Sequence, residues 1–283
     1  MLNDVGKYRL MDAEKYMIFD HPVQYKNFLI KPVKMIDYVR FHESVICLLL
    51  DKNSVPDIEV ISMTYLEYLL HVGKENPLYF LALDQLLRIV LSVRIIDDDG
   101  TQNIFELTHS EDIQFLNSGK GLVIKGEVLN GEDFDEIKAI ICEQNQIELI
   151  DESISKAVRD EIAKAEEYKR RQNQNKICSL EDQLVAVVIK TGLSFEYLHE
   201  ITIRKFSKIL ERADHAMHYE IYLEGVVTGQ MKMKDGEMPK HWLADLHEED
   251  KHKNAKMDYD ELKGKVGADS EPDDPEDIEN KTN

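Results

Sequence analysis

Cysteine, tryptophan and long apolar runs are all scarce in this 283-residue sequence. Its three cysteines are Cys47, Cys142 and Cys178, an odd number at wide spacings, which is not the pattern of a disulfide framework. Cys47 and Cys142 lie in apolar runs, which indicates buried thiols in a reducing compartment. The apolar runs are too short to span a bilayer, and the N-terminus lacks a secretory signal pattern. We therefore expect a cytoplasmic protein with no membrane partner.

Positive charge is also in short supply. The 35 Lys and Arg residues stand against 55 Asp and Glu residues, so the formal net charge is −20. Such a surface repels the phosphates of nucleic acids and of anionic lipids. It suits a basic protein partner, and we expect no nucleic-acid partner. Hydrophobic residues make up 43% of the chain, which is enough to bury a core.

The periodicity of the chain predicts a mainly α fold with a small β insertion, an α+β class. Five segments are predicted: a flexible arm over 1–20, an N-terminal α domain over 21–150 with the β insertion at 92–130, a charged helix and linker over 151–178, a C-terminal helical domain over 179–247, and a disordered acidic tail over 248–283. The tail is assigned on its many acids and few apolar residues, which cannot offset the entropy of ordering.

Within the N-terminal part, the pattern predicts one short strand over 25–33, limited by Pro32. Helices are expected over 35–50, over 62–71 and over 78–91. The second of these has a capping-box pair, Thr64 and Glu67, and a stop at Gly73. Pro77 opens the third.

The β insertion is predicted to hold three or four short strands. The turn signal Asp97-Asp98-Asp99-Gly100 predicts a hairpin with strands on either side. A further β run over 121–129 ends at Asn130 and leads into a helix whose apolar residues include Phe134 and Ile137.

The C-terminal domain has the clearest start and stop signals. Ser179, Ser194 and Thr202 are expected N-caps, and Gly192 is expected just after the end of the first helix. That helix is almost wholly apolar, which predicts a central, buried position. The helix after Thr202 should run to about residue 227. Pro239 should then open a short helix in which Trp242 closes the bundle.

Four motifs resemble metal-binding or phosphate-binding sites, and each has a simpler interpretation. His247 and His252 are five residues apart rather than the four of a zinc-protease helix. The Asp97–Gly100 run fits a turn better than a calcium loop, and Gly119-Lys120-Gly121 lacks the spacing of a phosphate-binding loop. The set Glu211, His215, His218 and Tyr219 fits a polar helix face better than half a metal site. The sequence therefore predicts no enzyme, no cofactor, and no catalytic, cofactor-binding or metal-binding residues.

The segment Ser179–Arg212 resembles tail and baseplate assembly proteins of large tailed bacteriophages. The resemblance is carried by Thr191-Gly192-Leu193-Ser194, by the helix start Ile201-Thr202-Ile203 followed by Phe206, and by Lys240–Leu246 with its tryptophan. Leu29–Tyr38 is similar to the strand-to-helix opening of that family. The β insertion and the acidic tail depart from the family pattern.

This resemblance implies a non-enzymatic, chaperone-like protein that binds a tail or baseplate protein during virion assembly. The alternative is a structural tail or baseplate component retained in the virion. The implied partner is a phage tail or baseplate protein. The implied location is the host bacterial cytoplasm during assembly, or the virion tail for a retained component.

Overall fold

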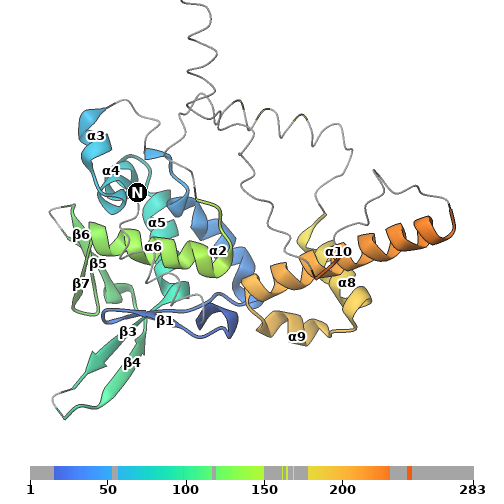
Figure 1. Cartoon of the computed structure of the whole chain (residues 1–283). Coiled ribbons are helices and arrows are strands. Elements are labelled where there is room, and N and C mark those ends of the chain that lie inside the picture. Colours follow the sequence, from blue (N-terminus) through green and yellow to red (C-terminus); the bar gives the residue numbers. More distant parts are fainter. Residues whose placement is uncertain are drawn as a thin grey trace, which may run out of the picture. The chain divides into compact units, whose positions relative to one another are not determined.

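The computed structural model describes residues 16–52, 57–97, 99–116, 119–149, 161, 164, 168, 178–229 and 241–243. These residues form helices and small antiparallel sheets, which confirms the predicted α+β class (Figure 1). The chain divides into two units, Met1–Asp214 and His215–Asn283, each of which is described by itself. The predicted acidic tail, most of the charged helix and linker over 151–178, and most of the N-terminal arm lie outside the described residues.

A four-stranded antiparallel sheet has the order β1-β2-β3-β4. Its strands are β1 (Val23–Tyr25), β2 (Phe28–Ile30), β3 (Leu91–Ile96) and β4 (Gln102–Glu106). The single strand predicted over 25–33 is therefore wrong. The chain reverses at Lys26, whose φ of 51° places it in the left-handed region. Lysine is not a usual residue for such a turn, so the sequence carries no signal for this hairpin.

A second antiparallel sheet has the order β5-β6-β7, with β5 (Ile113–Phe115), β6 (Gly121–Ile124) and β7 (Glu127–Asn130). The predicted three or four strands over 92–130 are too few, because the described residues from 91 to 130 form five strands in two sheets. The β run over 121–129 is broken by a turn at Lys125 and Gly126, both with positive φ. The predicted hairpin at Asp97–Gly100 is confirmed, and it joins β3 to β4.

The helices of the N-terminal part follow the predicted order with three differences, of which the first is a short helix over residues 58–62 that was not predicted. Their bounds are η1 Met35–Asp37, α2 Tyr38–Ser44, η2 Val45–Leu48, α3 Ile58–Ser62, α4 Tyr65–Glu75, α5 Leu78–Val90 and α6 Gly131–Asn145. The helix predicted over 35–50 is a short α-helix between two 3-10 turns. Gly73 does not stop α4: it lies inside the helix, where a Cβ atom would stand 2.7 Å from the ring of Phe80. The absence of a side chain there permits close packing of α4 against α5.

One apolar core joins both sheets to the helices. Its largest fully buried side chains come from every layer: Ile30, Leu48, Leu66, Leu69, Leu83, Leu86, Leu87, Leu91, Leu122, Ile124, Leu129 and Phe134. At its centre the ring of Phe134 stacks on that of Tyr65, with centroids 6.4 Å apart. The Tyr65 hydroxyl donates to the carbonyl of Cys47 at 2.9 Å and accepts from the amide of Leu50 at 2.9 Å. Tyr65 therefore ties α4 to the end of the η2 segment.

The three cysteines differ in burial, and burial sets the reactivity of their thiols. Cys47 and Cys142 are buried, as predicted, while Cys178 is exposed. Burial raises the pKa of the Cys47 thiol to about 12 and that of Cys142 to about 11. Because the thiolate is the reactive form, the two buried thiols should be inert in the folded protein.

We expect one of the three thiols to react quickly with an aromatic disulfide reagent in the native protein, and all three to react after unfolding in urea. Absorbance of the released thiolate measures both rates. The Cys178→Ser variant is the control and should show no fast phase. A fast phase in that variant would mean that the Cys47 or Cys142 environment opens easily.

Candidate protein-binding site

Three helices after residue 178 begin and end where the sequence predicts. They are α8 (Leu180–Thr191), α9 (Phe195–Glu200) and α10 (Ile203–Val227). The hydroxyl of Ser179 accepts from the Asp182 amide at 3.1 Å, and the Asp182 carboxylate accepts from Ser179 in return. Gly192 follows α8 with a φ of 74°. Ser194 and Thr202 cap α9 and α10 through their hydroxyls.

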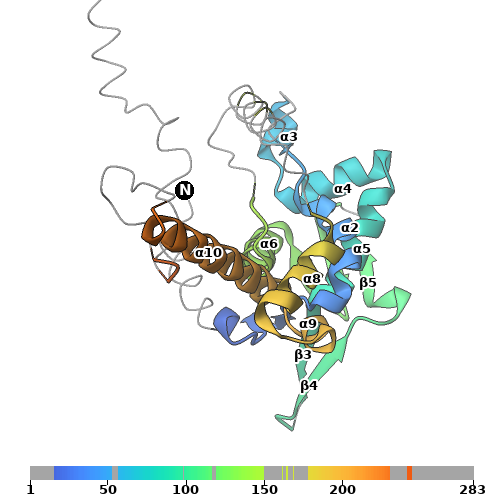
Figure 2. The same ribbon diagram turned by 90° about the vertical axis from the view of Figure 1, so that its right-hand side faces the viewer.

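Backbone and charged contacts hold this segment against the N-terminal part. The amide of Met35 donates to the carbonyl of Ile201, and the amide of Ile203 donates to the carbonyl of Val33, both at 2.9 Å. Lys34 pairs with Glu200 at 2.6 Å. The buried apolar side chains of this segment join the common core, and they are Val187, Leu198, Ile201, Ile203 and Phe206. Figure 2 shows α8 and α9 beside each other, with α10 starting where α9 ends.

The outer side of α8 is apolar and exposed, contrary to the prediction that this helix is central. Of its residues only Val187 is buried, at 1% exposure, while Ile189 is 78% exposed. Val185 is also exposed and lies one helical turn before Ile189, so the two share a face. The continuous apolar pattern gave no sign of which face would stay in solvent, because no polar stripe marks one.

The neighbouring helix α9 carries more exposed apolar area and a negative rim. Phe195 and Tyr197 are both exposed. Hydrogen bonds from its own amide and from Ser194 lower the pKa of Glu196, and Lys34 lowers the pKa of Glu200. Both carboxylates therefore stay ionised well below neutral pH. We call the exposed apolar residues Val185, Ile189, Phe195 and Tyr197 the α8–α9 face.

Two hollows lie elsewhere on the first unit. One, of about 310 Å³, lies between η2 and α5 and is mostly apolar, with Ile46, Leu78 and Leu81 among its lining residues. The other, of about 390 Å³, is polar, and Glu59, Glu67, His71 and Lys74 line it. Glu67 already accepts from the Thr64 amide and hydroxyl in the capping box. Ser62 and His71 both line the polar hollow, and the Ser62 hydroxyl donates to the carbonyl of Glu59 at 2.8 Å rather than to the His71 ring.

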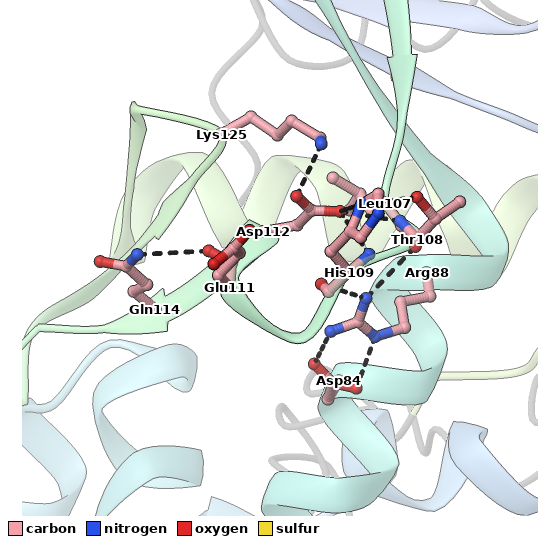
Figure 3. A network of polar contacts seen from close by, with 9 residues as sticks. All are labelled: Asp84, Arg88, Leu107, Thr108, His109, Glu111, Asp112, Gln114 and Lys125. Atoms are coloured by element: carbon pink, nitrogen blue, oxygen red, sulfur yellow. Dashed lines mark hydrogen bonds and ion pairs between the residues drawn. The ribbon is translucent and has the colours of Figure 1, made fainter.

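A polar network joins α5 to the loop before β5 and to the β6–β7 turn (Figure 3). The guanidinium of Arg88 binds both oxygens of Asp84, at 2.7 and 2.8 Å, and donates to the carbonyls of Leu107 and His109. Hydrogen bonding to Asp84 raises the pKa of Arg88. Arg88 therefore ties the loop that follows β4 to α5.

Asp112 is the second centre of the network. Its carboxylate is nearly buried and accepts from Lys125 Nζ at 2.6 Å and from the amides of Thr108 and His109 at 2.8 and 2.7 Å (Figure 3). Lys125, followed by these amides, lowers the pKa of Asp112 to about 2 against the unfavourable effect of burial. Each charge in the network is used by another protein group, which is the pattern of a structural cluster. The sequence does not predict this cluster, because its members lie far apart in the chain.

Three of the four candidate functional motifs lie at least partly in the described residues. Asp97 and Gly100 close the β3–β4 turn, with the Gly100 amide donating to the Asp97 carbonyl at 2.8 Å. Gly119 lies between β5 and β6 with a positive φ, and Gly121 is the first residue of β6. Glu211 accepts from Lys208 at 2.9 Å. His247 and His252 lie outside the described residues.

Within the described ranges, no three His, Cys, Asp or Glu side chains gather as metal ligands. His215 and His218 lie exposed on α10, and the ring of Tyr219 packs edge-on against His241 at 5.1 Å. In the same part of the chain no helix has the length and apolar character needed to cross a membrane.

Trp242 corrects a further prediction. It lies in a turn over the described residues 241–243 and is half-buried, with the ring of His241 5.7 Å away. The burial of Trp242 that is implied by its predicted place at the end of a bundle is therefore only partial. The rest of the expected helix from Pro239 to Leu246 lies outside the described residues.

Comparison with known proteins gives one family match. Residues 169–247 match the family described as the YomV second domain, which is phage-derived. No curated protein and no solved structure matches the chain. The matched segment contains α8, α9 and α10, and therefore the α8–α9 face. The similarity is to a phage-associated domain, and it does not specify the tail or the baseplate.

Proposed function

We propose that this chain is a non-enzymatic phage protein that binds a tail or baseplate protein during virion assembly, and that the α8–α9 face is the binding surface. One observation carries the proposal: the segment that is similar to a phage-derived domain is also the segment that leaves Ile189 and its neighbours in solvent. Exposed apolar residues on one helix face, such as Val185 and Ile189 on α8, commonly mark a protein-binding site.

Charge supports a basic client. The chain has a net charge of −20, and Glu196 lies on α9 next to Phe195 and Tyr197 as an ionised group. Complementary charge accelerates the encounter of two proteins, and salt screens it over about 8–10 Å. The same charge opposes binding to nucleic acid. Apolar contacts at Ile189 would then hold the complex once it has formed.

Affinity capture of the tagged full chain from phage-infected or prophage-induced cells tests this proposal. We expect mass spectrometry to identify a tail or baseplate protein, with slower association at higher salt. The Ile189→Lys variant should bind it at least about tenfold more weakly, as expected for loss of a central apolar contact. Ile58→Lys is the matched control, since Ile58 is 85% exposed on α3 and far from this face in sequence.

Three results would contradict the proposal. These are recovery of no tail or baseplate protein at either salt, co-purification with DNA, or equal loss of binding in both lysine variants. Mass spectrometry of purified particles then separates the two roles. An assembly factor should be absent from the particles, whereas a retained component should be present at a fixed copy number.

A further inference from the structure

Among the described residues, the outer edge of β4 is an unpaired strand edge. In the sheet order β1-β2-β3-β4, β4 has a neighbour on one side only. It is five residues long and contains neither proline nor lysine, whereas the opposite edge, β1, has three residues. Natural sheets usually protect their edges by short strands, prolines or lysines. Figure 1 shows the β3–β4 hairpin extending away from the helices, so none of the labelled helices covers it.

The hydrogen-bond pattern shows which groups are unused. The Asp97 amide donates to the Thr101 carbonyl, and the Arg94 amide donates to the Asn27 carbonyl on the β2 side. Bonded pairs alternate in an antiparallel ladder, so Asn103 and Phe105 bond to β3. The amides and carbonyls of Gln102, Ile104 and Glu106 therefore point away from β3. In the described part of the chain, no other strand pairs with this edge.

We propose that β4 pairs with β4 of a second copy of this chain, antiparallel about Ile104, to give a continuous sheet across a dimer. In this register Ile104 faces its own equivalent, and Gln102 faces Glu106. An apolar side chain that is 60% exposed in the single chain becomes a cross-strand pair, and an amide meets a carboxylate. No like charges lie directly opposite, because Glu106 faces Gln102, and Glu106 is also paired with Lys31 of its own chain.

A two-fold axis makes this contact closed, so it ends at a dimer. The pairing is short, and its area should fall below the roughly 1,200 Å² at which stable interfaces begin. The net charge of −20 on each copy also opposes association. We therefore expect a weak dimer that grows with protein concentration and that salt strengthens. This salt response is opposite to that expected for a basic client, so the two proposals can fail separately.

Sedimentation velocity of the full chain over a range of concentrations, at low and high salt, tests the dimer. Ile104→Pro removes only an outward amide, so it spares the β3–β4 bonds. Ile104→Lys places two like charges face to face. Both variants should stay monomeric, whereas Ile58→Lys, with the same change in charge at another exposed isoleucine, should dimerise like the wild type.

Amide hydrogen exchange followed by NMR provides a test without variants. On dilution from the dimer to the monomer, the amides of Gln102, Ile104 and Glu106 should lose protection while those of Asn103 and Phe105 keep theirs. The proposal is overturned if the wild type stays monomeric at every concentration and salt. It is also overturned if the Ile104 variants still dimerise, if Ile58→Lys abolishes the dimer as well, or if the alternating loss of protection is absent.

Discussion

Replacing Phe134 by alanine should lower the free energy of unfolding by about 3–5 kcal/mol. Phe134 is fully buried in the first turn of α6 and stacks on Tyr65 of α4. Truncation removes apolar surface from the core and leaves a cavity beside a ring that is itself fixed by two hydrogen bonds at its hydroxyl. The surroundings can therefore collapse only partly, which places the cost in the upper part of the range for core truncations.

Urea unfolding followed by circular dichroism measures this change. Phe19→Ala is the matched control, because Phe19 is 68% exposed. That variant should lie within about 0.5 kcal/mol of the wild type. Similar losses in the two variants would show that the junction of α4 and α6 is not the tightly packed centre described above.

The second large effect is expected at Asp112. Removal of its side chain leaves Lys125 and two loop amides without their acceptor, and Asp112→Ala should cost about 3 kcal/mol. Glu111→Ala is the control, since Glu111 is exposed and the carboxylate that accepts from Lys125 and the loop amides is that of Asp112. A loss below about 0.5 kcal/mol in Asp112→Ala would show that the network contributes little to stability.

The pH dependence of the same variant follows from the lowered pKa. The folded pKa of about 2 lies below the ordinary value of 3.8, so ionised Asp112 stabilises the fold at pH values above about 4. This contribution, about 2 kcal/mol, is lost as the pH falls from 4 towards 2. The difference in unfolding free energy between wild type and Asp112→Ala should shrink over that interval. A difference that stays constant down to pH 2 would contradict the ion pair with Lys125.

Local signals in the sequence predicted local structure well. The capping box of Thr64 and Glu67, the caps of Ser179 and Ser194, and the Asp97–Gly100 turn all involve residues within four positions of one another. Such signals act through hydrogen bonds between near neighbours and are therefore readable from the chain alone. They fixed the order of most helices and one hairpin.

Features that depend on distant residues were not predicted. The β2–β3 pairing joins residues about sixty positions apart. Because of it, β3 and β4 belong to the sheet of β1 and β2, while β5, β6 and β7 form the second sheet. Whether Ile189 is buried depends on where α8 docks, which is set by contacts such as Met35 with Ile201. The sequence predicts a helix stop at Gly73, but this glycine is needed inside α4 for its contact with Phe80 of the next helix. The local sequence does not show that contact. The α8–α9 face was therefore visible only in the structure.

Cross-linking of the captured complex gives the most direct test of binding through the α8–α9 face. Lys190 follows Ile189 at the exposed end of α8, whereas Lys74 lies on α4 beside the polar hollow. With a lysine-reactive reagent and mass spectrometry, we predict cross-links to a tail or baseplate protein from Lys190 and none from Lys74. Cross-links to the client from Lys74 and none from Lys190 would contradict the assignment of the α8–α9 face as the binding surface.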